Sequence, residues 1–486
     1  MAPAASKLAR RSFRGGRSIA DDDRLSALPD ELLLRVLSLL PARQAVQTAA
    51  LATRYVDLWR SLPGIILDAN HFSESPHGPW SEASAKMQAF VRKLLLSHDA
   101  KCLETFRLTA YYGDLGSLGH VDTWIRSAIF RANPLELEVQ GIYCCGSEFY
   151  LFPIIPRGLA FSNPCRRLTR LKLMGVSLDK SFAERFQSWW PKLEDLVLMQ
   201  CYIGFCDIRS DGLKNLAIQY CNSPRADVFV IRAPALASLT LAFHNESYRD
   251  GVSLHVGDRV VRASIHLLGG RELFSPRCQA MMLASLFNVK SLEMQHFHAM
   301  VVLDDELFDI LPMFTNMRTL TLSSSFVNSS VMSCVNNFKA LGRFLQKAPN
   351  METLILEDCD VAPTVELGEY PMLENLRTLI LDTCSLHDNF GLLHHCLRNS
   401  PNLEKLIVKY CQVSGGSTGG EGKAKPKKTQ ELNMVPLHCP KLKFTELKHR
   451  RNDADLASEI GSPAPARLAL LNEARQAKPA RKPNAP

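Results

Sequence analysis

Short stretches in which apolar and polar residues alternate recur along much of the chain. The recurring unit is aliphatic-x-x-Leu-x-aliphatic, and this alternation predicts a short strand that sends two side chains inward. Clear copies are LTRLKL (168–173), LEDLVL (193–198), LKNLAI (213–218), LASLTL (236–241), VKSLEM (289–294), MRTLTL (317–322), METLIL (351–356), LRTLIL (376–381) and LEKLIV (403–408). A degenerate copy, VVRASIHL, lies near residues 260–267.

The spacing of these copies indicates a repeat protein. The central leucines Leu171, Leu196, Leu216 and Leu239 are 25, 20 and 23 residues apart. These are leucine-rich-repeat periods. One such unit cannot bury its apolar face alone, so stacked units share a continuous core and a parallel sheet. Helical spacing of apolar residues occurs in NNFKALGRFLQKA (336–348) and FGLLHHCLRNS (390–400), which are expected to form helices on the convex side. The proline in APNM and in SPNL ends the segment that precedes it.

Cysteine recurs three places after the last aliphatic residue of the strand pattern. We expect this position to begin a tight turn inside the stack, where backbone groups need hydrogen-bond partners and where such repeats place Asn or Cys. The cysteines in this register are Cys201, Cys221, Cys359, Cys384 and Cys411. The rival interpretation is a redox or metal array, but successive cysteines on successive coils are too spread for one ion.

The outward positions of the strands define a concave face. It includes the aliphatic residues Val197, Ile355, Ile380 and Ile407, which are expected to be exposed there. An exposed apolar line implies either a docked protein partner or a covering segment of the same chain. The candidate target-binding residues are Val197, Met199, Ile355, Glu357, Ile380, Asp382, Ile407 and Lys409.

Residues 21–68 have the pattern of a compact helical module. Aliphatic residues from Leu32 to Leu40 recur at helical spacing, with Pro29 at the entry and Pro41 at the stop. A second amphipathic run extends from Gln44 to about Ser61. A module of this size is too small for a good core of its own, so its exposed aliphatic surface suggests that a partner completes the fold.

The net charge of +8 is located at the two ends of the chain. Residues 1–20 carry +5 and residues 421–486 carry +7, so the remaining 400 residues carry −4. This distribution argues against a basic nucleic-acid groove on the folded part. The 14 cysteines form no C-x-x-C or Cys/His cluster, which indicates free thiols in a reducing compartment, no metal site and no cofactor. No apolar run reaches the length of a membrane span.

The front module resembles an F-box of the plant F-box/leucine-rich-repeat family, including its FBD-like members. The stretch LPDELLLRVLSLLPARQAVQTAALATRYVDLWRSLP matches the family pattern over some 35 positions. The matching residues are Leu28, Pro29, Glu31, Leu32, Leu33, Val36, Leu37, Leu40, Pro41, Ala45, Val46, Leu51, Arg54, Leu58 and Trp59. It departs at Ala52, Thr53 and Tyr55, where serine, a basic residue and tryptophan are common. CPKLKFTELKHRRNDADLASEI (439–460) resembles the closing segment of many members.

The resemblance implies an α/β fold: a helical F-box followed by a leucine-rich-repeat solenoid with a parallel sheet on the concave face and helices or loops on the convex face. It also implies a non-catalytic substrate receptor that binds a Skp-family adaptor and, through it, cullin and RING subunits of a ubiquitin ligase. The implied adaptor-binding residues are Leu28, Pro29, Glu31, Leu32, Leu33, Val36, Leu37, Leu40, Pro41, Val46, Leu51 and Leu58. The alternative is a scaffold that binds partners without directing ubiquitylation.

The expected organisation follows the sequence from end to end. Residues 1–20 are a disordered basic tail or, alternatively, a transit peptide; 21–68 are the F-box; 69–164 connect through irregular early repeats. Residues 165–413 are the repeats, 414–432 a mobile Gly/Lys-rich insertion, 433–460 the last repeat and closing segment, and 461–486 a disordered tail. KAKPKK (423–428) is either a nuclear import signal or a solvated charge run, so the expected location is nucleus or cytoplasm.

Overall fold

The computed structural model describes residues 27–73, 80–100, 102–112, 123–129, 133–143, 165–223, 227–244, 248, 250–268, 274–323, 333–359, 370–384, 391–411 and 441–448. The sequence predictions for residues 1–20, 414–432 and 461–486 lie outside these ranges, as does most of 433–460. The chain divides into two compact units, residues 1–144 and 145–486, which are described separately.

The first unit combines helices with three parallel strands. Its strands pair in the order β1-β2-β3, with Ile65 opposite Phe106 and Phe106 opposite Leu137. The region 69–164, predicted to contain irregular early repeats, therefore does contain strands, in the stretches CLETFRL (102–108) and NPLELEV (133–139). The elements are α1 (Asp30–Ser38), α2 (Ala42–Gln47), α3 (Thr53–Leu58), β1 (Gly64–Asp68), α4 (Trp80–Ser97), β2 (Thr105–Tyr112) and β3 (Glu136–Tyr143), with 3-10 turns at Thr48–Ala50, Trp59–Ser61 and Ala69–Phe72.

The second unit is the predicted parallel-sheet solenoid. Every copy of the repeat forms a strand, the degenerate copy included. Each strand pairs in parallel with the next one, and the pair β9–β11 alone among these has a register shift, between Ala242 and Phe243. In chain order the strands of the copies are β4 (Arg170–Met174), β6 (Asp195–Met199), β9 (Asn215–Cys221), β11 (Ser238–His244), β13 (Arg262–Leu268), β14 (Ser291–Gln295), β15 (Thr319–Ser323), β16 (Thr353–Glu357), β17 (Thr378–Asp382) and β18 (Lys405–Lys409). A further strand, β19 (Phe444–Lys448), pairs with β18.

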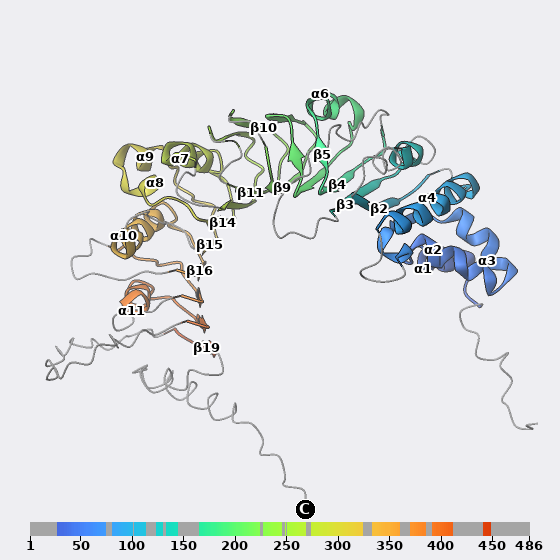
Figure 1. Ribbon diagram of the computed structural model, residues 1–486. Coiled ribbons are helices and arrows are strands. Elements are labelled where there is room, and N and C mark those ends of the chain that lie inside the picture. Colours follow the sequence, from blue (N-terminus) through green and yellow to red (C-terminus); the bar gives the residue numbers. More distant parts are fainter. Residues whose placement is uncertain are drawn as a thin grey trace, which may run out of the picture. The chain divides into compact units, whose positions relative to one another are not determined.

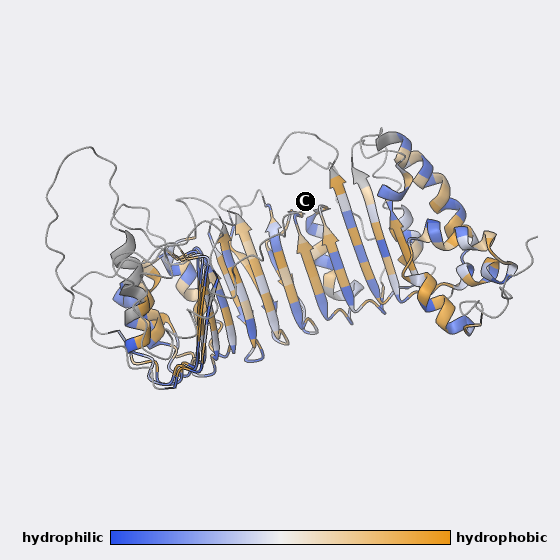
Figure 2. Ribbon diagram, turned by 90° about the horizontal axis from the view of Figure 1, so that it is seen from below, coloured by the Kyte–Doolittle hydropathy of each residue, from blue (hydrophilic) through white to orange (hydrophobic). Residues whose placement is uncertain are grey.

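Alternation along each strand separates a core face from an outward face. In β16 the buried residues are Leu354 and Leu356, whereas Thr353, Ile355 and Glu357 are half-buried on the other side. The same pattern of hydrophobic and hydrophilic bands is visible along neighbouring strands in Figure 2. Because successive strands are in register, the inward side chains form continuous columns through the stack, as the period-2 pattern predicts.

Helices cover the convex side of the second unit (Figure 1). The two predicted helical stretches form α10 and α11, and Pro349 and Pro401 follow their last residues by three places. The helices are α6 (Lys180–Trp189), α7 (Pro276–Ala284), α8 (Met300–Leu303), α9 (Asp305–Ile310), α10 (Ser333–Gln346) and α11 (Gly391–Arg398).

Between α6 and α7 the convex layer contains a small sheet. Its strands pair in parallel in the order β12-β10-β8, and β5 pairs separately with β7. Aromatic rings fill the space beneath it: the Phe229 and Tyr248 rings are 4.5 Å apart, and the Tyr248 hydroxyl donates to the Phe205 carbonyl at 3.2 Å. The strands are β5 (Ser177–Leu178), β7 (Tyr202–Ile203), β8 (Asp207–Arg209), β10 (Phe229–Ala233) and β12 (Val252–Val256).

The recurring cysteines satisfy backbone groups inside the stack, which confirms the structural interpretation. Each thiol donates to a carbonyl on the preceding strand: Cys201 to Leu173 at 3.3 Å and Cys384 to Leu356 at 3.2 Å. The sulfurs of Cys221, Cys359 and Cys411 lie 3.5 to 3.6 Å from the equivalent carbonyl, and 3.3 to 3.5 Å from the carbonyl two residues earlier in the chain, which is an alternative acceptor. Burial holds the pKa of the Cys221 thiol well above its ordinary value, so the thiol stays protonated and able to donate.

The residue before each of these cysteines has a left-handed backbone. The φ angles are 51° at Gln200, 55° at Tyr220, 47° at Asp358, 52° at Thr383 and 52° at Tyr410. This conformation turns the chain sharply and points its amide toward the next coil: the Thr383 N–H donates to the Lys409 carbonyl at 2.8 Å. Non-glycine residues pay a steric cost in this region, and a β-branched residue such as Thr383 pays the most.

Candidate functional site

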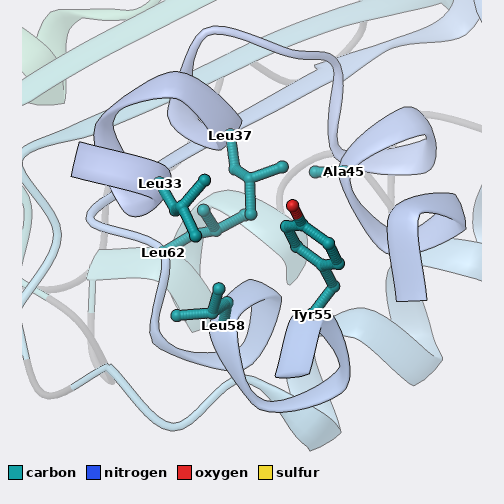
Figure 3. Close-up of a cluster of buried hydrophobic side chains, with 6 residues drawn as sticks. All are labelled: Leu33, Leu37, Ala45, Tyr55, Leu58 and Leu62. Atoms are coloured by element: carbon teal, nitrogen blue, oxygen red, sulfur yellow. The ribbon is translucent and has the colours of Figure 1, made fainter. Parts of the chain in front are cut away.

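The helices at the start of the first unit pack around a small core of their own. Six buried side chains meet there: Leu33, Leu37, Ala45, Tyr55, Leu58 and Leu62 (Figure 3). They come from α1, α2, α3 and the segment that follows α3. Leu28, Leu34, Leu40 and Trp59 pack against this cluster from its edge.

Helix α1 has a second apolar face that this core does not use. Leu32 is 46%, Val36 43% and Leu39 79% exposed. Their spacing of i, i+4 and i+7 places them on one side of the helix, next to the face that buries Leu33 and Leu37. We call Leu32, Val36 and Leu39 the α1 stripe. A contiguous exposed aliphatic face of this kind marks an interaction surface.

The structure divides the residues predicted to bind an adaptor into three groups. Leu33, Leu37 and Leu58 are buried in the module's core, so they have little surface to offer a partner. Leu28, Leu40, Pro41 and Val46 are half-buried, and Pro29, Glu31, Leu32, Val36 and Leu51 are exposed. Adaptor contact by this set stays a prediction. Leu39 was missed, although its spacing from Leu32 and Val36 could have identified it.

Arg54 connects the first turn of α1 to α3. Its Nε donates to Asp30 Oδ1 at 2.8 Å, and a terminal guanidinium nitrogen donates to the Leu28 carbonyl at 2.8 Å. Both side chains are substantially exposed, so the ion pair stabilises the module by about 1 kcal/mol at most. Its geometric effect is to fix the orientation of α1, and with it the direction in which the α1 stripe faces.

The three departures from the F-box pattern have different structural roles. Tyr55 is buried in the core, so an aromatic ring still fills that position. Thr53 is exposed at the start of α3. Ala52 is the N-cap residue of α3, with an extended backbone and no side-chain cap. A serine there would supply the missing hydrogen-bond acceptor.

The outward face of the second unit is organised in rows because the strands are in register. Ile355 lies opposite Ile380, which lies opposite Ile407, and we call these three the isoleucine row. Val197 does not join them, because the strands between β6 and β16 place Ala217, Thr240, Ser264, Glu293 and Thr321 in the same row. Met199, on the strand of Val197, is likewise distant from this row.

One expectation about the isoleucine row was wrong. Ile355 and Ile380 are partly exposed, but Ile407 is only 6% exposed. Its strand neighbours on the same face are Lys405 and Lys409, and its neighbours across the sheet are Ile380 and Glu446. We attribute the burial of Ile407 to the long aliphatic stems of Lys405, Lys409 and Glu446, which surround it on three sides.

Two acidic residues, Glu357 and Asp382, lie beside the isoleucine row, and we call this pair the acidic row. Glu357 lies opposite Asp382, and Asp382 lies opposite Lys409. The Ser323 hydroxyl donates to Glu357 at 2.6 Å, and Lys409 Nζ is 3.6 Å from Asp382. The predicted residues Glu357, Asp382 and Lys409 are therefore adjacent, next to the isoleucine row.

A polar cluster lies further along the same face. His266 Nε2 is 3.0 Å from both Ser264 Oγ and Glu293 Oε1. The hydrogen bond from His266 lowers the pKa of the Glu293 carboxyl, against the opposing effect of partial burial. Both contacts use the same imidazole nitrogen, so this is not the relayed arrangement of a nucleophile, a base and an orienting acid.

Within the described ranges, no group of three or more His, Cys, Asp or Glu side chains has the geometry to hold a metal ion. None of the described helices is both long enough and apolar enough to cross a membrane.

Comparison with known proteins finds similarity to plant F-box proteins. No family model matches the sequence. The chain is 27% identical to the MEIOTIC F-BOX protein MOF of Oryza sativa subsp. japonica, over 89% of this chain and 81% of that protein. It is 22% identical to the FBD-associated F-box protein At1g66310 of Arabidopsis thaliana, over 87% and 98% respectively. It is 36% identical to the putative F-box/FBD/LRR-repeat protein At4g00315 of the same plant, over 45% and 52%.

These similarities agree with the helical module, the in-register parallel sheet and the repeat spacing. The chain is a distant homologue of plant F-box/FBD/LRR-repeat proteins, at 22% to 36% identity.

Proposed function

We propose that this protein is the substrate-recognition subunit of an SCF-type cullin–RING ubiquitin ligase. Its F-box binds a Skp-family adaptor, which connects it to the cullin and RING subunits, and its concave strand face binds the target protein. The observation that carries the proposal is the α1 stripe. Leu32, Val36 and Leu39 are exposed along α1 and its C-cap, although the neighbouring face of the helix already packs in the module's core.

The α1 stripe supports adaptor binding on physical grounds. An aliphatic face left in water disfavours the free protein, and burying it against a partner recovers that free energy. The hydrogen bonds of Arg54 to the first turn of α1 hold the stripe in one orientation before binding. A surface ordered in advance loses less conformational entropy when a complex forms.

The second unit contributes recognition and no chemistry in this proposal. A receptor accelerates ubiquitin transfer by holding a target lysine near the ubiquitin-charged enzyme, which is catalysis by proximity. The protein needs no nucleophile, base or metal of its own for that role. The concave face supplies the isoleucine row and the acidic row as the contacts for a target.

Adaptor binding is tested by a Leu32→Ser, Val36→Ser double variant. Fully burying a Leu or Val side chain is worth about 1.5–3 kcal/mol, and these two side chains are a little under half exposed. Losing both should therefore cost about 2 kcal/mol, a fall of roughly 30-fold in affinity for a purified Skp-type adaptor. Isothermal titration calorimetry measures this difference directly.

The matched control is Leu96→Ser on α4. Leu96 is 66% exposed and lies outside the α1 stripe, so its loss should leave adaptor affinity unchanged. Circular dichroism of the double variant checks that its helices remain folded. The proposal fails if the unaltered protein does not bind the adaptor, or if Leu96→Ser weakens binding as much as the double variant does.

A reconstituted ubiquitylation reaction distinguishes the receptor from a scaffold. Once a target is identified, a receptor should transfer ubiquitin to it only when the adaptor, cullin and RING subunits are all present. A scaffold would hold the same target without modification.

A further inference from the structure

The outward face of strands β14 to β17 has an unusual charge pattern. Its twelve outward positions contain three carboxylates, Glu293, Glu357 and Asp382, and no lysine or arginine. We call this face the acidic platform. Its other members are Ser291, Gln295, Thr319, Thr321, Ser323, Thr353, Ile355, Thr378 and Ile380.

On two strands of this platform, β16 and β17, an acidic residue follows an isoleucine by two positions. Ile355 and Glu357 lie two residues apart on β16, as Ile380 and Asp382 do on β17, so both pairs face outward. Adjacent strands in a sheet are about 4.8 Å apart, and residues two apart along a strand are about 6.7 Å apart. The result is an aliphatic pair beside a carboxylate pair, with the hydroxyls of Thr353 and Thr378 on the other side.

The carboxylates of the platform keep capacity for a further cation. Glu357 and Asp382 are directly opposite each other, an arrangement that is unfavourable for like charges. Glu357 accepts a hydrogen bond from the Ser323 hydroxyl, which brings no charge, and Asp382 has Lys409 at 3.6 Å. An ionised carboxylate has about four acceptor sites, so these contacts leave room for an incoming ammonium or guanidinium group.

We propose that the target segment recognised by this face is basic and aliphatic: an extended protein segment that sets a Leu, Ile, Val or Phe side chain on the isoleucine row and a Lys or Arg against Glu357 and Asp382. The inference rests on the proposed function for its assignment of the concave face to target binding. The sign of the charge excludes a nucleic-acid occupant here, because phosphates would face three carboxylates.

The geometry also sets the length of the segment. Crossing from β14 to β17 spans three inter-strand gaps, about 14 Å, which an extended chain covers in about four residues. A segment of that length reaches Glu293 at one end and Ile380 at the other. The aliphatic residue and the basic residue should therefore be close neighbours in the target sequence.

The test selects peptides of about ten residues, enough to cover this span with flanking residues on both sides, from a random display library against the full-length chain. We expect the recovered sequences to be enriched in Lys or Arg next to an aliphatic or aromatic residue. Affinity of one recovered peptide should fall on the order of tenfold with Glu357→Lys and further with Glu357→Lys, Asp382→Lys. It should also weaken as the salt concentration rises.

Charge exchange provides the decisive control. A peptide whose Lys or Arg is replaced by Glu should lose affinity for the unaltered protein and regain it for the Glu357→Lys, Asp382→Lys variant. Glu184→Lys, a charge reversal at an exposed position on the convex helix α6, should change neither affinity. The inference is overturned if no peptide is recovered, if recovered peptides lack basic residues, or if Glu357→Lys leaves binding unchanged.

The same variants separate this inference from the proposed function. The Glu357→Lys, Asp382→Lys variant should bind the Skp-type adaptor normally, because the α1 stripe is intact. Adaptor binding without peptide binding would reject the basic target segment alone. Peptide binding with the expected charge dependence, in a protein that does not bind the adaptor, would reject the ubiquitin-ligase role and leave the recognition chemistry standing.

Discussion

Replacing Ala52 with serine should stabilise the F-box module. Ala52 precedes α3 with φ −158° and ψ 151°, the extended backbone of an N-cap residue, and its side chain offers no hydrogen-bond acceptor to the amides of the first turn. At this end of the helix the Tyr55 N–H donates to the Ala52 carbonyl at 3.1 Å. Serine at an N-cap is worth about 1 kcal/mol relative to alanine.

The effect should be local and measurable by hydrogen exchange. Helix α3 carries Tyr55 and Leu58 into the module's core, so fraying of its first turn loosens both. A gain of about 1 kcal/mol corresponds to roughly fivefold slower exchange if the amides open by local unfolding. Mass spectrometry of peptides covering residues 53–61 would report this change.

The control for this substitution is Ala50→Ser. Ala50 is exposed two residues earlier, inside a 3-10 turn, and cannot cap α3. Serine there should leave exchange unchanged or slightly faster, given its lower helix propensity. Slower exchange in both variants, or no change with Ala52→Ser, would refute the capping argument.

Two further predictions concern the repeat stack. Thr383→Asn should raise the free energy of unfolding by about 0.5–1 kcal/mol, because asparagine tolerates the left-handed backbone better than a β-branched residue does. Thr378→Asn, on the extended strand β17, should lower it. Urea denaturation of both variants checks that the two changes have opposite signs. Cys384→Ala should destabilise the protein by about 1–3 kcal/mol, because it leaves the buried Leu356 carbonyl without the thiol donor. Cys102→Ala, at an exposed position, should change stability little. Equal losses of stability in thermal denaturation would contradict the role given to the Cys384 thiol.

The repeat strands were predictable because their signal is local and repeated. Alternation in segments such as METLIL identifies both the strand and its buried leucines, and the cysteine register follows from the turn that each strand must make. The convex sheet of β8, β10 and β12 was not predicted. Its strands, such as FVIRA, are short apolar runs outside the repeat unit, and periodicity alone does not distinguish them from helix or loop.

In the F-box the sequence identified the apolar helix but not its buried side. The sequence predicts a wide apolar face on α1, because Leu32, Leu33, Val36 and Leu37 are all apolar. Which of them is buried depends on where α2 and α3 pack, which the local pattern does not encode. The burial of Ile407 has the same origin, since it depends on Glu446 from a strand far along the chain.

The pairing of β18 with β19 shows how freely this fold accepts added chain. The connection between β17 and β18 has 22 residues (383–404) and that between β18 and β19 has 34 (410–443), yet both pairs are in register. The entropy of closing a flexible loop grows only with the logarithm of its length, so each doubling of the length costs about 0.6 kcal/mol. This connection is therefore a suitable place to insert an affinity tag or a fluorescent reporter without weakening the sheet, and repeats on either side of it could be exchanged as cassettes between relatives.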